Sequence, residues 1–164
     1  MRNPEKPMEK KVRLSIERYG REIEKSHDLK LLLVGSVTNT HSEYCMFFTS
    51  DKEITLKQGQ ELAVSIVKDF LQMLLQNPVV KRYANWAKTY YISPTSTYSP
   101  TLDTVGLKIA FWDHNTNRPK APFLAEIMFE NRTFYYYEAD PKTQALRLVH
   151  TESYADADRG VETE

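Results

Sequence analysis

The segment from Thr55 to Pro78 constrains the fold of this chain more than any other. Thr55 and Gln58 have the spacing of a capping box, in which the two side chains bond the backbone groups that a helix start leaves unpaired. The Asn77-Pro78 pair ends the helical pattern. A broad apolar face runs between these signals, formed by Ala63, Ile66, Val67, Phe70, Leu71 and Leu74. The segment therefore predicts a central core helix.

A second, amphipathic helix is predicted to start near Met8. Its apolar side chains recur in steps of four, three and four residues, which place them on one stripe: Val12, Ile16, Tyr19 and Ile23. Residues 1–7 contain two prolines and several charges, and we expect a loose arm there.

The predicted strands fall into two groups. Residues 29–40 and 43–49 are rich in aliphatic and aromatic side chains, and the polar stretch between them favours an antiparallel hairpin. Period-two alternation then predicts a meander of four strands with short links. Its members are residues 105–112, 123–130, 133–138 and 145–150.

This order of elements predicts an α+β fold with a single antiparallel sheet, made of the hairpin and the meander and packed against two helices. A sheet that curves around a helix is similar in outline to cystatin-like or nuclear-transport-factor-like folds, although the element order matches neither cleanly. We expect one domain over residues 8–151, followed by an acidic, weakly ordered tail over residues 152–164.

Charge and composition exclude several classes of protein. The 22 basic and 22 acidic side chains cancel, so nucleic acid is an unlikely partner. One cysteine and four scattered histidines predict no disulfide, no metal site and no cofactor. The longest apolar run is too short to span a bilayer. The N-terminus lacks the apolar core of a signal peptide, which favours the cytoplasm unless an export signal was removed.

Reactive side chains come close together in the sequence at two places. His41, Glu43 and Cys45 would share one face of a strand but lie too far apart for a nucleophile and base to touch, so we expect a buried thiol and a solvated turn histidine. Asp113 and His114 follow a strand and are typical of a turn. A small hydrolase or thiol-dependent enzyme is kept as the alternative function.

The connector over residues 79–101 is the strongest candidate for a binding element. Steps of four and three residues predict a short helix at its start, and the prolines among Ser and Thr that follow exclude regular structure. Long ordered loops are often functional, and tyrosine combines apolar area with a polar tip. The candidate ligand-binding residues are Tyr83, Trp86, Tyr90, Tyr91 and Tyr98. Nearby lysines and an arginine also suggest a single-strand nucleic-acid platform, against which the neutral net charge argues.

Three stretches resemble a small bacterial family of uncharacterised α+β domains. They read ITLKQGQELAVSIVKDFLQMLLQNPVVKRYANW, LDTVGLKIAFWD and KAPFLAEIMFENRTFYYYEADP. The resemblance spans residues 8–157 and consists mainly of core positions. It implies a long central helix, a short aromatic segment and an antiparallel meander in this order, and it implies no activity and no catalytic residue.

The leading hypothesis is a non-enzymatic binding or protein-interaction domain. It would use the sheet face or the aromatic connector to hold a protein segment or a small apolar ligand. The alternative outside binding and catalysis is a structural protein that associates with itself, as a homodimer, through a sheet edge.

Overall fold

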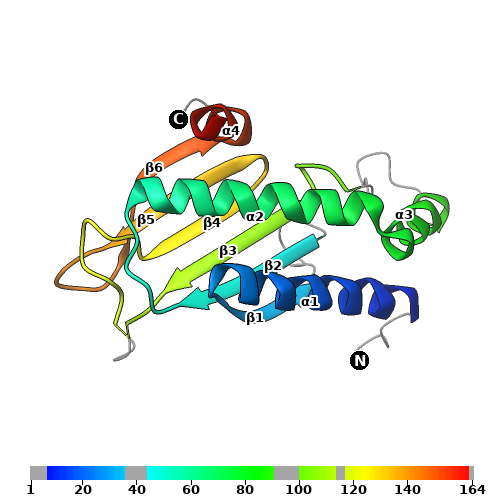
Figure 1. The fold of residues 1–164 in the computed structure, drawn as a ribbon, viewed down its shortest axis with the longest axis horizontal. Coiled ribbons are helices and arrows are strands. Elements are labelled where there is room, and N and C mark those ends of the chain that lie inside the picture. The colour runs from blue at the N-terminus through cyan, green and yellow to red at the C-terminus, as the bar shows by residue number, and fades with distance from the viewer. Residues whose placement is uncertain (1–6, 36–43, 91–99, 114–116, 163–164) are drawn as a thin grey trace.

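The computed structural model describes residues 7–35, 44–90, 100–113 and 117–162, with side chains described over 10–35, 44–85, 100–113 and 117–160. The chain forms one six-stranded sheet and four helices within these ranges (Figure 1). The elements are α1 Pro7–His27, β1 Lys30–Gly35, β2 Tyr44–Ser50, α2 Leu56–Gln76, α3 Pro78–Tyr90, β3 Val105–Phe111, β4 Glu126–Glu130, β5 Thr133–Ala139, β6 Leu146–Ser153 and α4 Tyr154–Glu162.

The sheet is mixed, and the expectation of a wholly antiparallel sheet was wrong. The strands lie in sequence order, and the hairpin of β1 with β2 and the meander from β3 to β6 are antiparallel as predicted. β2 and β3, however, pair in parallel. A parallel pair needs a crossover that returns the chain to the same end of the sheet, and α2, α3 and the segment after them supply it.

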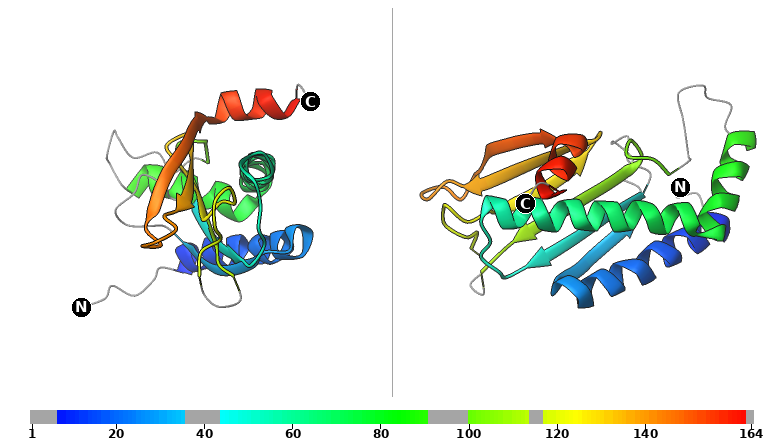
Figure 2. Two further views of the ribbon diagram at one scale, coloured as in Figure 1. Left: turned by 90° about the vertical axis from the view of Figure 1, so that its left-hand side faces the viewer. Right: turned by 45° about the horizontal axis from the view of Figure 1, so that its top comes forward.

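The helices α1, α2 and α4 lie on one face of the sheet (Figure 2). Alternate strand residues point from the sheet into the layer between strands and helices and are buried there. Large members of this core from the strands and from α2 are fully buried: Tyr44, Met46, Phe48, Ile66, Phe70, Ile109, Phe129 and Tyr136. The four predicted stripe residues of α1 also face this core, and Tyr19 stacks on Phe70 with ring centroids 6.0 Å apart.

Both ends of α2 follow the sequence signals. The capping box is present, since Thr55 Oγ1 accepts a bond from the Gln58 backbone amide (3.3 Å) and Gln58 Oε1 accepts one from the Thr55 amide (2.9 Å). At the other end, Asn77 Oδ1 accepts bonds from the amides of Val79 and Val80 at the start of α3. Asn77 therefore ends one helix and begins the next.

The C-terminal segment is folded where a weakly ordered tail was expected from residue 152. β6 continues to Ser153, and α4 follows at once. Ala157 is buried against the core, and Lys68 on α2 pairs with Asp158 on α4 at 3.0 Å. The acidic composition predicted disorder because the segment has few apolar residues. Tyr154, the first residue of α4, nevertheless packs against Phe129 and Phe134 in the core, and together with Ala157 it docks the short helix.

Each edge strand of the sheet contains a bulge. The β1 register shifts between Leu31 and Leu33, which leaves Leu32 without a residue opposite it on β2. The β6 register shifts opposite Tyr136 and Tyr137, which leaves Val149 without a residue opposite it on β5. Bulges interrupt the row of backbone groups that another strand would need, so both edges are poor templates for strand pairing.

Gly59 allows α2 to approach β4 closely. A Cβ atom built on Gly59 would lie 2.4 Å from Leu124 Cδ1 and 3.1 Å from Ile127 Cδ1, and both of these side chains are buried. Gly160 in α4 is a helical glycine whose Cβ would meet no atom within 4 Å.

We expect Gly59→Ala to lower the free energy of unfolding by about 1 to 2 kcal/mol. Overpacking a closed core costs up to about 3 kcal/mol, while replacing a helical glycine by alanine returns about 1 kcal/mol. Gly160→Ala is the matched control and should leave stability unchanged or raise it. Urea unfolding followed by circular dichroism measures both. Equal effects of the two substitutions would contradict the close approach of α2.

Candidate functional site

The sheet face opposite the helices, which we call the open face, carries large side chains in a row across all six strands. Direct register pairs connect them from β1 to β6, and we call this the central row: Leu33, Phe47, Lys108, Met128, Tyr135 and Thr151. Within the part of the chain that the structure describes, no helix lies over this face of the sheet (Figure 2). An aromatic and methionine surface of this kind is typical of binding faces.

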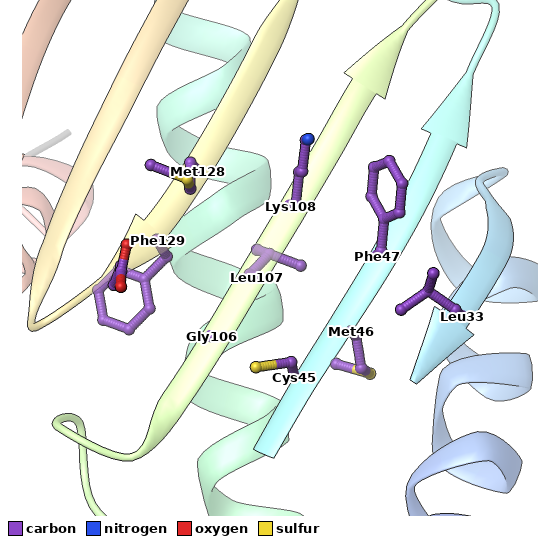
Figure 3. Close-up of a pocket in the computed structure, with 10 residues that line it drawn as sticks. Leu33, Cys45, Met46, Phe47, Gly106, Leu107, Lys108, Met128 and Phe129 are labelled. Carbon is purple, nitrogen blue, oxygen red and sulfur yellow. The ribbon is translucent and has the colours of Figure 1, made fainter. Parts of the chain in front are cut away.

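A row of small residues lies beside the central row. Gly35, Cys45 and Gly106 are opposite one another on β1, β2 and β3, and we call them the small-residue row. The large side chains of one row therefore stand next to the low floor of the other. The result is a groove of about 320 Å³ over β2, β3 and β4, bordered by Phe47 and Met128 (Figure 3).

Charged groups flank this groove. Lys108 Nζ lies 3.4 Å from Glu126 Oε1 and 4.9 Å from the centroid of the Phe47 ring, which is cation–π distance. Glu130 lines the groove from β4. Burial, with a smaller contribution from the charge of Glu126, raises the pKa of Tyr137 on the same face. The open face thus presents an apolar groove with one cation and carboxylates around it.

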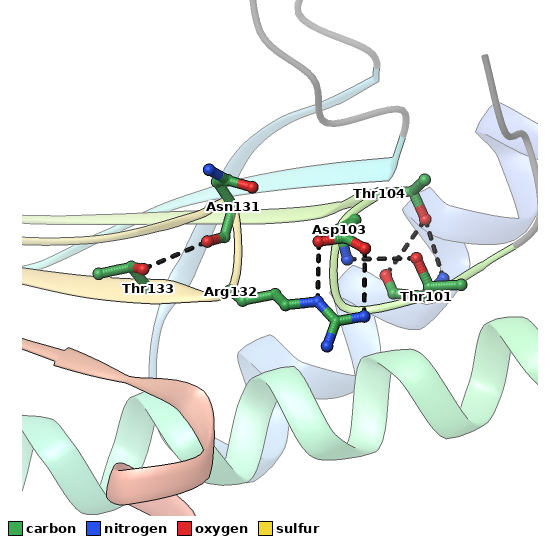
Figure 4. A network of polar contacts seen from close by, with 6 residues as sticks. All are labelled: Thr101, Asp103, Thr104, Asn131, Arg132 and Thr133. Carbon is green, nitrogen blue, oxygen red and sulfur yellow. Dashed lines mark hydrogen bonds and ion pairs between the residues drawn. The ribbon is translucent and has the colours of Figure 1, made fainter. Parts of the chain in front are cut away.

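An ion pair fixes the end of the sheet where β3 begins. The guanidinium of Arg132, in the β4–β5 turn, donates to both carboxylate oxygens of Asp103 at 2.8 and 3.1 Å (Figure 4). Thr104, next in the chain, bonds back to Thr101, and its carbonyl accepts from the Tyr44 amide at 2.9 Å. These contacts hold the start of β3, and hence Gly106, in register with β2.

Cys45 is in the groove floor and is 8% exposed. The buried position agrees with the expectation of a packed thiol. His41, which the thiol-enzyme alternative needs as a base, and His114 lie outside the described residues. Asp113 accepts a bond from the Asn117 amide at 3.0 Å, as the turn interpretation requires.

We expect Cys45 to react slowly with a thiol-specific maleimide at neutral pH, about a hundredfold slower in the native chain than in urea, because the packed sulfur is reached only after local opening. Mass spectrometry over time measures the fraction labelled. Labelling of the native chain as fast as that of the unfolded chain would instead indicate an accessible, activated thiolate.

Sequence reasoning missed a polar cluster on the helix side of the sheet. Glu152 Oε1 accepts bonds from the Tyr136 hydroxyl (3.0 Å) and from Gln60 Nε2 (3.1 Å), and His150 Nε2 lies 3.5 Å from Glu152 Oε2. Burial and the neighbouring carboxylate raise the pKa of Tyr136 far above its usual value, so the phenol is a permanent donor. The cluster connects β5, β6 and α2 through hydrogen bonds to Glu152, as a structural network does.

Removal of the Tyr136 hydroxyl should therefore cost stability. Tyr136→Phe leaves Glu152 with one donor fewer, and we expect a loss of about 1 to 3 kcal/mol in the free energy of unfolding. Tyr135→Phe, the neighbouring substitution on the open face, should stay within about 0.5 kcal/mol. Urea unfolding measures both, and equal losses would show that the Glu152 bond contributes nothing.

A second hollow, of about 650 Å³, lies between the end of α1 and the start of α2. Side chains of both signs line it, and Lys52 Nζ bridges Asp28 Oδ2 and the His27 carbonyl, each at 3.4 Å. These contacts join the α1–β1 turn to the segment before α2, so we interpret the lining charges as structural.

The connector residues predicted to bind ligand are placed only in part. Tyr83 is on the buried side of α3 and belongs to the core. Trp86 and Tyr90 lie on α3, but their side chains, like Tyr91 and Tyr98 as a whole, lie outside the described residues. The groove was missed, although the sequence contains a signal for it: residues 44–50 carry no charge, which is unusual for a strand with one solvated face.

Comparisons with protein-family models, with curated proteins and with solved structures find no match for this chain. Among the described residues, no helix is long and apolar enough to cross a membrane. The same residues contain no group of three or more histidine, cysteine or carboxylate side chains that could hold a metal ion.

Proposed function

We propose that this chain is a non-enzymatic interaction domain that holds an apolar surface of another protein chain on the open face of its sheet. The observation that carries the proposal is the groove beside the central row, bordered by Phe47 and Met128 and floored by Gly106 and Cys45. A strand face in contact with water ordinarily alternates to polar residues, so a face this apolar favours a covering partner.

The shape of the groove favours a protein over a small molecule. Small-molecule sites are concave, measure about 300–1,000 Å³ and enclose most of the ligand. This groove is near the lower limit of that range and lies open along a sheet face. A flat or gently hollowed surface of aromatic and methionine side chains is better suited to the packing of another protein's apolar residues.

The charges on this face support the same proposal. Lys108 is held by Glu126 and lies over Phe47, so its ammonium already has a partner at the groove border. Polar groups that ring an apolar centre are typical of interfaces, where the rim sets orientation and the centre supplies most of the affinity. The chain as a whole has no net charge, with 22 basic and 22 acidic side chains, and this also favours contact with protein over contact with nucleic acid.

An anilinonaphthalene sulfonate dye, which fluoresces when it binds exposed apolar surface, tests the proposal. The double variant Phe47→Ala with Met128→Ala should lower the fluorescence enhancement at least about threefold, because most of the apolar border is removed. The control is Leu14→Ala with Leu75→Ala, which removes two apolar side chains from α1 and α2 that are more exposed than Phe47 and Met128. It should change the enhancement little. Equal effects of the two double variants would overturn the assignment of the binding face.

A further inference from the structure

We propose that the partner on the open face is a second copy of this chain, and that the two copies exchange contacts between Lys108 of each copy and Glu130 of the other. This inference rests on the proposed function, since it names the occupant of the same face. It is carried by a match in shape and a match in charge within the open face itself.

The shape match follows from the two rows. A twofold dimer requires one surface that is complementary to itself. Here the tall central row and the low small-residue row run side by side across the strands. A twofold axis lying across the strands between these rows places Phe47 of one copy over Cys45 of the other, and Lys108 over Gly106. The tall side chains of each copy then fill the hollow of the other, with the aligned geometry in which sheets pack.

The charge match involves neighbouring strands. Lys108 on β3 is in the central row, and its direct register partner on β4 is Met128. Glu130 lies two residues after Met128 on the same strand and the same face. In the twofold arrangement, each Lys108 side chain lies over the glycine of the second copy and next to its Glu130. Two identical attractive contacts form, and neither copy needs a net charge, which agrees with the equal number of acids and bases.

The bulges in the two edge strands favour a dimer that forms through the open face over one that forms through a sheet edge. Both β1 and β6 contain a bulge, so the ladder that edge pairing would extend is interrupted on each side. Among the residues that the structure describes, the open face is accessible: Leu33 at one end of the central row is 50% exposed, and the Lys108 side chain at its middle is 44% exposed. A dimer formed through this face is closed, with each apolar groove covered once.

Charge reversal tests the inference by sedimentation velocity. The wild-type chain should change from monomer to dimer between low micromolar and several hundred micromolar concentration. Lys108→Glu and Glu130→Lys should each weaken the dimer at least about tenfold, because each creates two like-charge contacts. An equal mixture of the two variants should dimerise again, since both contacts between unlike copies pair Glu with Lys.

Controls separate this result from damage to the fold. All variants are made in a Glu126→Gln background, which removes the carboxylate that faces residue 108 within the chain, and circular dichroism checks that each variant is folded. Lys57→Glu and Glu61→Lys reverse charges on the exposed side of α2 and should leave the dimer unchanged.

Three outcomes overturn the inference. They are a wild-type chain that stays monomeric throughout, a dimer indifferent to both reversals, and a mixture that fails to recover. In each case the dye experiment remains an independent test of the proposed function, because it does not depend on dimer formation. Dye binding that depends on Phe47 and Met128 would then retain the open face as an interaction surface for a different protein.

Discussion

The packing of α2 against one face of the sheet is the interaction on which the rest of the structure depends. Its buried residues, from Gly59 to Leu74, lie over the centre of the sheet. The close approach at Gly59 sets the distance between the layers. Because α2 runs back along the sheet between β2 and β3, the chain can enter β3 at the end of the sheet where β2 begins, and the two strands run in parallel (Figure 1).

One consequence of this two-layer arrangement is that the apolar content of the strands exceeds what one helical layer can cover. Phe47 and Met128 point away from α2 and remain part-exposed at the groove. Proteins seldom leave a contiguous apolar patch uncovered without an interaction that uses it. The fold and the proposed function thus have a common physical origin, because β2 carries no charged residue on either of its faces.

The sequence predicted those elements whose signals are local. The capping box at Thr55 and the alternation of residues 105–111 each correspond to an observed feature. The parallel pairing of β2 with β3 was missed because the alternation of apolar residues indicates which side chains share a face. It does not indicate which strands are neighbours or in which direction they run. The groove was missed for a related reason. Its floor depends on Cys45 and Gly106, which lie about sixty residues apart in the sequence but opposite each other on the neighbouring strands β2 and β3. The binding role of Trp86, Tyr90, Tyr91 and Tyr98 in the connector stays a prediction.

The interrupted outer ladders limit how this protein can grow into larger assemblies. An uninterrupted strand at each side would allow copies to add one after another without end, which is the route to fibres. With Leu32 and Val149 bulged out of register in the two edge strands, the pairing of a further strand is hindered at both edges of the sheet. Open-ended addition of copies through the sheet edges is therefore disfavoured.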